Sequence, residues 1–126
     1  MTKAASIGIA RVYDDTDRAA GARLLVDRVW PRGIRKQDLH LDAWIKEVAP
    51  STGLRKWFGH DPEKWDEFRA RYHAELDENL DAVARCLDWC RKGPTVLLYS
   101  AKDRDHNQAI VLRDYLRAAL TQGMPE

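Results

Sequence analysis

The order of apolar and polar positions predicts three strands and leaves a fourth segment open. Residues 6–13 alternate loosely and contain β-branched side chains, residues 22–29 have an apolar centre, and residues 95–99 (TVLLY) are apolar throughout. A continuous apolar run of the last kind is typical of a strand that is covered on both faces of a sheet. Residues 41–48 (LDAWIKEV) suit a strand or a helix, because their apolar positions fit either period.

Helix signals occupy the middle and the end of the chain. Ser51 has the side chain and position of an N-cap for the LRKWF segment, which Gly59 would end. Asp61 would cap the next helix, with Pro62 in a first position where the missing N–H group costs nothing. Three apolar stripes at helical spacing predict buried helix faces: Trp65, Phe68, Tyr72 and Leu76; Leu80, Val83, Leu87 and Cys90; Ala109, Leu112, Leu116 and Ala119.

Together these elements predict a single α/β domain over residues 1–126. Its core would be a small, mostly parallel sheet of about three or four strands, flanked by helices. A right-handed crossover would place the helices of residues 62–92 over one face of that sheet. Short disordered tails are expected at residues 1–5 and 121–126.

Composition narrows the partners and the compartment. The 21 Lys and Arg residues nearly balance the 20 Asp and Glu residues, so any anion site must be local. No stretch approaches the roughly 18 apolar residues of a membrane span, so we expect no membrane association and a cytoplasmic protein. Cys86 and Cys90 share a helical pattern in which a good disulfide would distort the turn, and they lack a partner pair for zinc. We therefore expect reduced thiols, no metal and no cofactor.

Polar residues are concentrated after the 95–99 strand, where seven of the eight residues from Ser100 to Asn107 are polar. Asp105 and Gln108 have the spacing of a capping box, which would place His106 and Asn107 in the first turn of the last helix. Ligands of open α/β sheets bind at this edge, outside the carboxyl ends of the strands. An ordinary capped turn with solvated charges explains much of the same segment, so both interpretations stay open.

A second polar loop, DRVWPRGIRK, begins at the end of the 22–29 strand. If the two strands are parallel, Arg28, Arg32 and Lys102 could converge on one anion beside His106. The structural alternative is that Asp27 pairs with an arginine to hold the loop, and that Trp30 and Pro31 pack as a lid.

These loops supply the candidate site residues. His106 would act as acid or base, Asp27 would orient an arginine or the histidine, and Ser100 is a further candidate as nucleophile. The candidate ligand-binding residues are Arg28, Arg32, Lys102, Asn107 and Trp30.

Three functions fit this pattern. The first is a small enzyme or ligand-binding domain with a phosphate-like or nucleotide-like anion at the strand ends. The second is a nucleic-acid-binding or regulatory protein that uses residues 28–36, with Trp30 stacking on a base. The third is a homodimeric scaffold without catalysis.

Four strings carry a resemblance to a known family: RVYD, GARLLVDRVWPRG, LDAWIKEVAPSTGLRKWFGHDP and LLYSAKDRDHNQAIVLRDYL. In this order they resemble the YeaO-like family of bacterial proteins, a branch of domain of unknown function 488, from about Arg11 to Leu116. Some members are labelled MarR-type regulators, but the helices here carry mixed charge and the positive residues gather in a loop. Longer relatives have a cysteine-containing loop after the last strand. Ser100 stands at that place, which argues against sulfur chemistry.

Overall fold

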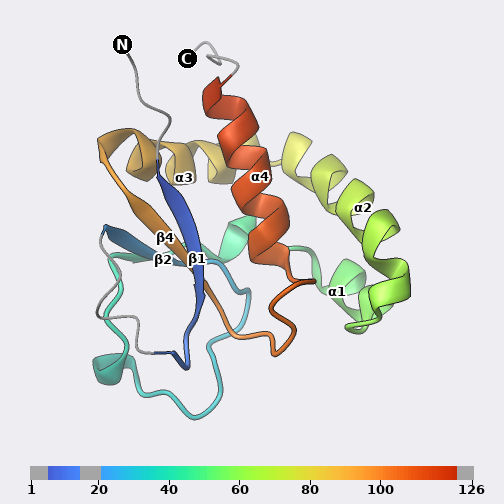
Figure 1. Cartoon of the computed structure of the whole chain (residues 1–126), viewed down its shortest axis with the longest axis horizontal. Coiled ribbons are helices and arrows are strands. Elements are labelled where there is room, and N and C mark those ends of the chain that lie inside the picture. Colours follow the sequence, from blue (N-terminus) through green and yellow to red (C-terminus); the bar gives the residue numbers. More distant parts are fainter. Residues whose placement is uncertain (1–5, 15–20, 122–126) are drawn as a thin grey trace.

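One parallel sheet organises the part of the chain that the computed structural model describes, which is residues 6–14 and 21–121. Its strand order is β1-β4-β2-β3, with β4 between β1 and β2 (Figure 1). The four strands are β1 (Ile7–Arg11), β2 (Ala22–Leu25), β3 (Ala43–Trp44) and β4 (Thr95–Tyr99), and every pairing is parallel. The predicted fold class, a small parallel sheet with helices in an α/β domain, is confirmed.

The two strands that carry the polar loops, β2 and β4, are parallel neighbours, as convergence of the two loops requires. Ala22 is in register with Thr95 and Leu25 with Leu98, and the N–H of Val26 donates to the carbonyl of Leu98 at 3.0 Å. The regular strand ends at Leu25, earlier than the predicted 22–29. Because the strands are parallel, both loops leave the same edge of the sheet.

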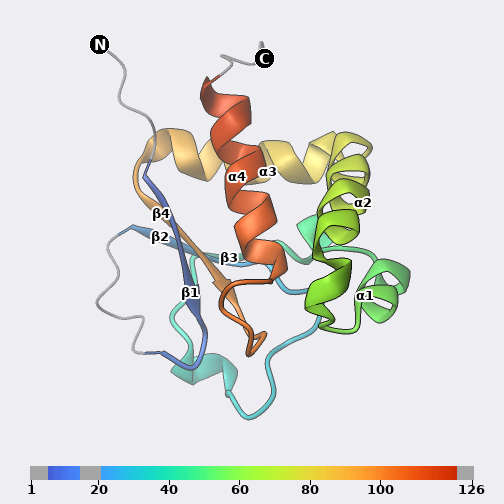
Figure 2. The ribbon, with the colours of Figure 1, turned by 45° about the vertical axis from the view of Figure 1, so that its right-hand side comes forward.

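All four α-helices of the described residues pack on one face of the sheet (Figure 2). Leu24 and Leu97 point to this face and share a core with Tyr72 and Leu112. The helices are α1 (Thr52–Phe58), α2 (Trp65–Asp77), α3 (Leu80–Lys92) and α4 (Gln108–Thr121). The prediction that residues 62–92 cover one face agrees with this arrangement.

The segment between β2 and β3, which contains no α-helix, covers the opposite face. Leu25 and Leu98 point there and form a smaller cluster with Leu39, flanked by the half-buried Trp30 and Trp44. This segment contains a 3-10 turn at Lys36–Asp38. Strand β4 is buried on both faces, as its apolar sequence predicts.

Local signals explain where the helices begin and end. The Ser51 hydroxyl accepts from the N–H of Leu54 at 3.2 Å, and Gly59 ends α1 with a left-handed φ of 55°. Asp61 accepts from the N–H of Glu63 in a 3-10 turn that starts at Pro62 and runs into α2. These predicted caps are confirmed.

Three predictions concern the ends of elements and of the chain: the burial of Leu80, the open segment 41–48 and the two tails. Leu80 was expected in a buried stripe but is 51% exposed, because it is the first residue of α3 and precedes the part that packs. The open segment 41–48 is a two-residue strand followed by a 3-10 turn at Lys46–Val48. The predicted tails fall on residues 1–5 and 122–126, outside the described residues, whereas Thr121 is the last residue of α4.

The structure of the described residues bears on the cysteines, on membrane-spanning helices and on metal-binding clusters. Cys86 and Cys90 are both buried and free, and burial raises the pKa of the Cys86 thiol to about 12. No helix in the described ranges is long and apolar enough to cross a membrane. Residues 6–14 and 21–121 contain no group of three or more His, Cys, Asp or Glu side chains that could hold a metal ion.

Candidate functional site

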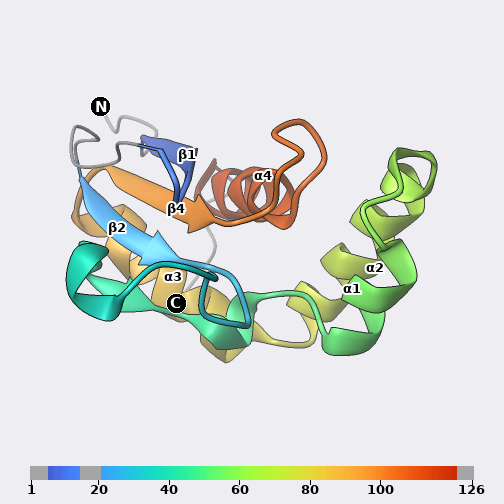
Figure 3. The same ribbon diagram turned by 90° about the horizontal axis from the view of Figure 1, so that it is seen from below.

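A pocket of about 830 Å³ opens at the carboxyl ends of β2 and β4. Figure 3 shows the loops after these strands leaving the sheet beside α1 and α2. The pocket walls come from Tyr13 and from three segments that lie far apart in the sequence: residues 27–32, residues 49–68 and residues 100–108. All eight predicted site residues line it: Asp27, Arg28, Trp30, Arg32, Ser100, Lys102, His106 and Asn107.

Asp27 forms the polar floor of the pocket. Its Oδ2 accepts from the Ser100 N–H at 3.0 Å and from the Ser100 hydroxyl at 2.5 Å, and its Oδ1 accepts from the Gln108 amide. Burial raises the pKa of Asp27, while these donors and the nearby positive charge of Arg55 oppose that rise. The expectation that Asp27 orients an arginine or His106 is wrong: its hydrogen-bonding partners are Ser100 and Gln108.

The loop after β4 is organised by Asp103 and Asn107. The Asp103 carboxylate accepts from the N–H groups of Asp105 and His106 at 2.9 and 3.0 Å, and these contacts lower its pKa. The Asn107 Oδ1 accepts from the Ile110 N–H at 3.1 Å, and its Nδ2 donates to the Asp103 carbonyl at 3.0 Å. Asn107 is therefore the N-cap of α4.

The predicted capping box of Asp105 and Gln108 is wrong. Asn107 directly precedes the first helical residue, Gln108, and its side chain reaches the N–H three residues on, as an N-cap does. Asp105 is exposed and Gln108 bonds to Asp27. Asn107, predicted as a ligand-binding residue, lines the pocket with both ends of its amide bound to backbone groups.

His106 is held at the pocket by two neighbours. Its Nδ1 lies 3.0 Å from Asp103 Oδ2, and its ring meets the edge of Trp65 with 5.2 Å between the ring centroids. About a third of the side chain is exposed. The arrangement fixes the ring and leaves Nε2 as the nitrogen that can meet a ligand.

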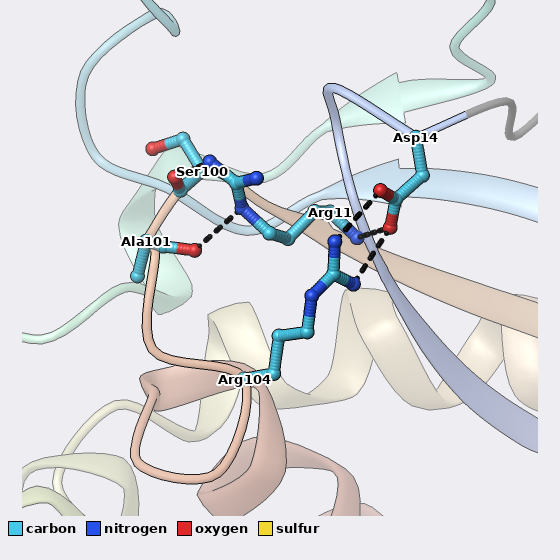
Figure 4. A network of polar contacts seen from close by, with 5 residues as sticks. All are labelled: Arg11, Asp14, Ser100, Ala101 and Arg104. Carbon is cyan, nitrogen blue, oxygen red and sulfur yellow. Dashed lines mark hydrogen bonds and ion pairs between the residues drawn. The ribbon is translucent and has the colours of Figure 1, made fainter.

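Charged side chains from β1 and the turn after it hold the same loop in place (Figure 4). Arg11 Nε donates to the Ala101 carbonyl at 2.8 Å, and its guanidinium also reaches the Ser100 carbonyl at 3.3 Å. Arg104 makes a two-pronged ion pair with Asp14, with both N to O distances 2.9 Å. Arg104, like Asp103, therefore holds the shape of this loop.

The loop after β2 is held by contacts to distant backbone. Arg28 donates to the carbonyls of Pro50 and Ala49 at 3.0 and 2.9 Å. The Trp30 indole N–H donates to the Ile34 carbonyl at 2.6 Å, and the ring packs edge to face on Trp44 with the centroids 5.4 Å apart. Arg28 and Trp30 thus line the pocket while much of their binding capacity is used within the fold.

Three cations at the pocket have no side-chain partner among the described residues. Arg32, Lys56 and Lys102 are exposed, and no hydrogen bond or ion pair joins their side chains to another described residue. Arg55 adds a fourth positive charge, close enough to Asp27 to influence its pKa. These groups exceed the two carboxylates that line the pocket, Asp27 and Asp103.

The α1 and α2 side of the pocket is aromatic. Phe58 and Phe68 stack with their ring centroids 4.3 Å apart and line the cavity together with His60. His60 has a positive φ of 59°, a conformation that costs energy for a residue with a Cβ. Arg55, Lys56 and Phe58 were not predicted as site residues, although all three lie in the LRKWF segment that was predicted to be a helix.

Comparison with known proteins supplies the family. A family model described as "Inactive DUF488-N3 subclade" matches residues 6–126. The chain belongs to the DUF488-N3i family. This result confirms the resemblance to YeaO-like proteins of domain of unknown function 488.

Bacterial relatives of this DUF488-N3i protein cover most of its length. The uncharacterised protein YeaO of Escherichia coli (strain K12) is 48% identical over 113 residues, which is 90% of this chain and 98% of YeaO. An uncharacterised protein of Mycobacterium tuberculosis (strain ATCC 25618 / H37Rv) is 49% identical over 79 residues, 63% of this chain and 67% of that protein. A protein of Mycobacterium bovis matches to the same extent. No solved structure is significantly similar to the chain.

Proposed function

We propose that this DUF488-N3i protein binds a small anionic ligand in the pocket at the strand ends, without converting it. The observation that carries the proposal is the set of cations at the pocket that lack a partner among the described residues: Arg32, Lys56 and Lys102. Side chains of this kind attract a phosphate or carboxylate group, and a concave site strengthens their field. A volume of about 830 Å³ lies within the range of small-molecule sites.

Two observations support binding over catalysis. The family model is described as an inactive subclade. In addition, the Ser100 hydroxyl donates its proton to Asp27, at the place where the resemblance puts a cysteine in longer relatives. In this proposal His106 contacts the ligand through Nε2, and Asp103 holds the ring.

The nucleic-acid and scaffold alternatives have less support. Stacking of Trp30 on a base would compete with the Lys36 ammonium, which lies over this ring, 6.0 Å from its centroid. Arg28 is engaged with backbone carbonyls. We place the protein in the cytoplasm, since its two free, buried thiols suit a reducing compartment.

Calorimetric titration with inorganic pyrophosphate and ribose 5-phosphate at low salt tests the proposal. We expect saturable binding that weakens as salt screens the exposed cations. Lys102→Ala and Arg32→Ala should each weaken binding about three- to tenfold, which corresponds to the loss of one partly screened charge. Arg69→Ala is the matched control, because Arg69 is exposed on α2 outside the pocket. Absence of binding, or an equal loss in all three variants, would contradict the proposal.

A further inference from the structure

The pocket is much larger than the anion that its cations would hold. Inorganic phosphate would leave most of the 830 Å³ empty, and the remaining walls are of two different kinds. One wall is aromatic and the floor is a buried carboxylate. The rest of the ligand must suit both surfaces.

The aromatic wall favours a flat, apolar body. Phe58 and Phe68 are both buried, stacked and part of the cavity lining. Arg55 precedes Phe58 by three residues on the same face of α1, which separates their Cα atoms by about 4.5 Å along the helix axis. A ring that lies against Phe58 would therefore carry its anionic group a short spacer away.

The floor favours a hydrogen-bond donor on that ring. The carboxylate of Asp27 has about four acceptor positions, of which Ser100 and Gln108 occupy three. The Ser100 hydroxyl uses its only proton on Asp27, so it too can offer only lone pairs to a ligand. The free capacity of Asp27 and Ser100 is therefore that of acceptors, which match an N–H group and repel a carbonyl oxygen.

We infer that the ligand is a nucleoside phosphate whose base carries an exocyclic amino group. The base lies against Phe58 and donates to Asp27, and the phosphate meets the cations of the pocket. This inference rests on the proposed function and adds the ligand class to it. A base with an oxo group at the same position would place an acceptor against the Asp27 carboxylate and lose that contact.

Titration of the unmodified protein distinguishes the anion site from the nucleotide preference. The probes are AMP, IMP, adenosine and ribose 5-phosphate, which differ in the amino group, the phosphate and the base. We expect AMP to bind at least tenfold more tightly than adenosine or ribose 5-phosphate, and at least fivefold more tightly than IMP. CMP and UMP form a second pair that should show the same preference for the amino base if the smaller ring is accepted.

Asp27→Asn replaces one acceptor oxygen of the carboxylate with an NH2 donor and keeps the side chain nearly the same shape. It should reduce the preference for AMP over IMP to about one, with near-ultraviolet circular dichroism confirming the fold. Ribose 5-phosphate binding without a gain for AMP would overturn the nucleotide inference and leave the anion site standing. No binding of any phosphate would overturn both, and a preference for AMP that survives in Asp27→Asn would overturn the role of Asp27.

Discussion

The loops after β2 and β4 leave the same edge of the sheet and line the same pocket, but they are held in different ways. The loop after β4 binds to itself through Asp103 and Asn107. It also binds to β1 through Arg11, to the turn after β1 through the Arg104–Asp14 pair, and to Asp27 through Ser100. The loop after β2 is fixed by Arg28 on the backbone of residues 49 and 50, and Tyr13 donates to its Arg32 carbonyl at 2.8 Å.

The number of polar residues in a loop does not tell how many of them can bind a ligand. The 100–107 segment has the greater concentration of polar residues, yet it offers a ligand only Lys102, the outer side of His106 and the lone pairs of the Ser100 hydroxyl. Backbone N–H and carbonyl groups in a turn need partners, and Asp, Asn and Arg side chains supply them here. Polar side chains in this loop therefore first satisfy the backbone groups of the turn, and the residues without such a task can bind a ligand.

Removing the N-cap of α4 should cause the largest loss of stability among the changes in these two loops. Asn107→Ala deletes two hydrogen bonds of a buried side chain and should lower the free energy of unfolding by about 2 to 3 kcal/mol. Urea denaturation measures the loss. Asp105→Ala is the control and should change the stability by less than about 0.5 kcal/mol, because its side chain is exposed. If Asp105→Ala costs more than Asn107→Ala, the capping role belongs to Asp105 after all.

Two arginines of the loop after β2 should give opposite results. Arg28→Ala removes charged donors from the carbonyls of Ala49 and Pro50 and should cost about 1.5 kcal/mol of stability. Arg32→Ala should leave stability nearly unchanged and weaken ligand binding. Arg28→Lys serves as a control, since a lysine keeps the charge but cannot form the same fork. Equal stability of Arg28→Ala and wild type in urea would show that this arginine does not hold the loop.

The smallest effect is a contrast in pH dependence between the two loops. The Arg104 guanidinium lowers the pKa of Asp14, so the stability from this pair is present at neutral pH and is lost as pH falls through the lowered pKa. Burial raises the pKa of Asp27. The contribution of Asp27 to stability is therefore fully present below the ordinary Asp pKa and is lost as pH rises through the raised value. Asp14→Asn and Asp27→Asn should therefore change the slope of stability against pH in opposite directions.

Urea midpoints between about pH 3 and 7 measure both slopes. The Asp14 pair is exposed, so its contribution should also shrink in high salt, whereas that of Asp27 should not. Parallel slopes in the two variants would mean that burial does not dominate at Asp27.

Short-range signals in the sequence predict much of this fold. The apolar run 95–99, the caps at Ser51 and Asp61 and the stripe of α4 all depend on neighbours a few residues away, and each is confirmed. The prediction of Asp105 as the cap failed because Asn107, two residues later, also has a side chain that can cap a helix. Only the exact start of α4 distinguishes them.

The site depends on longer distances along the chain. The polar edge could be located, because parallel strands bring their carboxyl ends together. The partners of Asp27 could not, since Ser100 and Gln108 lie 73 and 81 residues away and carry no local signal of the contact. For the same reason the aromatic wall of α1 escaped notice: Phe58 fits a helix stripe whether or not a pocket lies beside it.

The assembly of the pocket from distant parts of the chain links ligand binding to folding. Residues 27–32, 49–68 and 100–108 form these walls only when the chain is folded, so a ligand bound there has no equivalent site on the unfolded chain. Mass action then adds about 2.7 kcal/mol to the unfolding free energy at a ligand concentration one hundred times the dissociation constant. In a cell that supplies the ligand, the abundance of the folded protein would itself report the ligand's concentration.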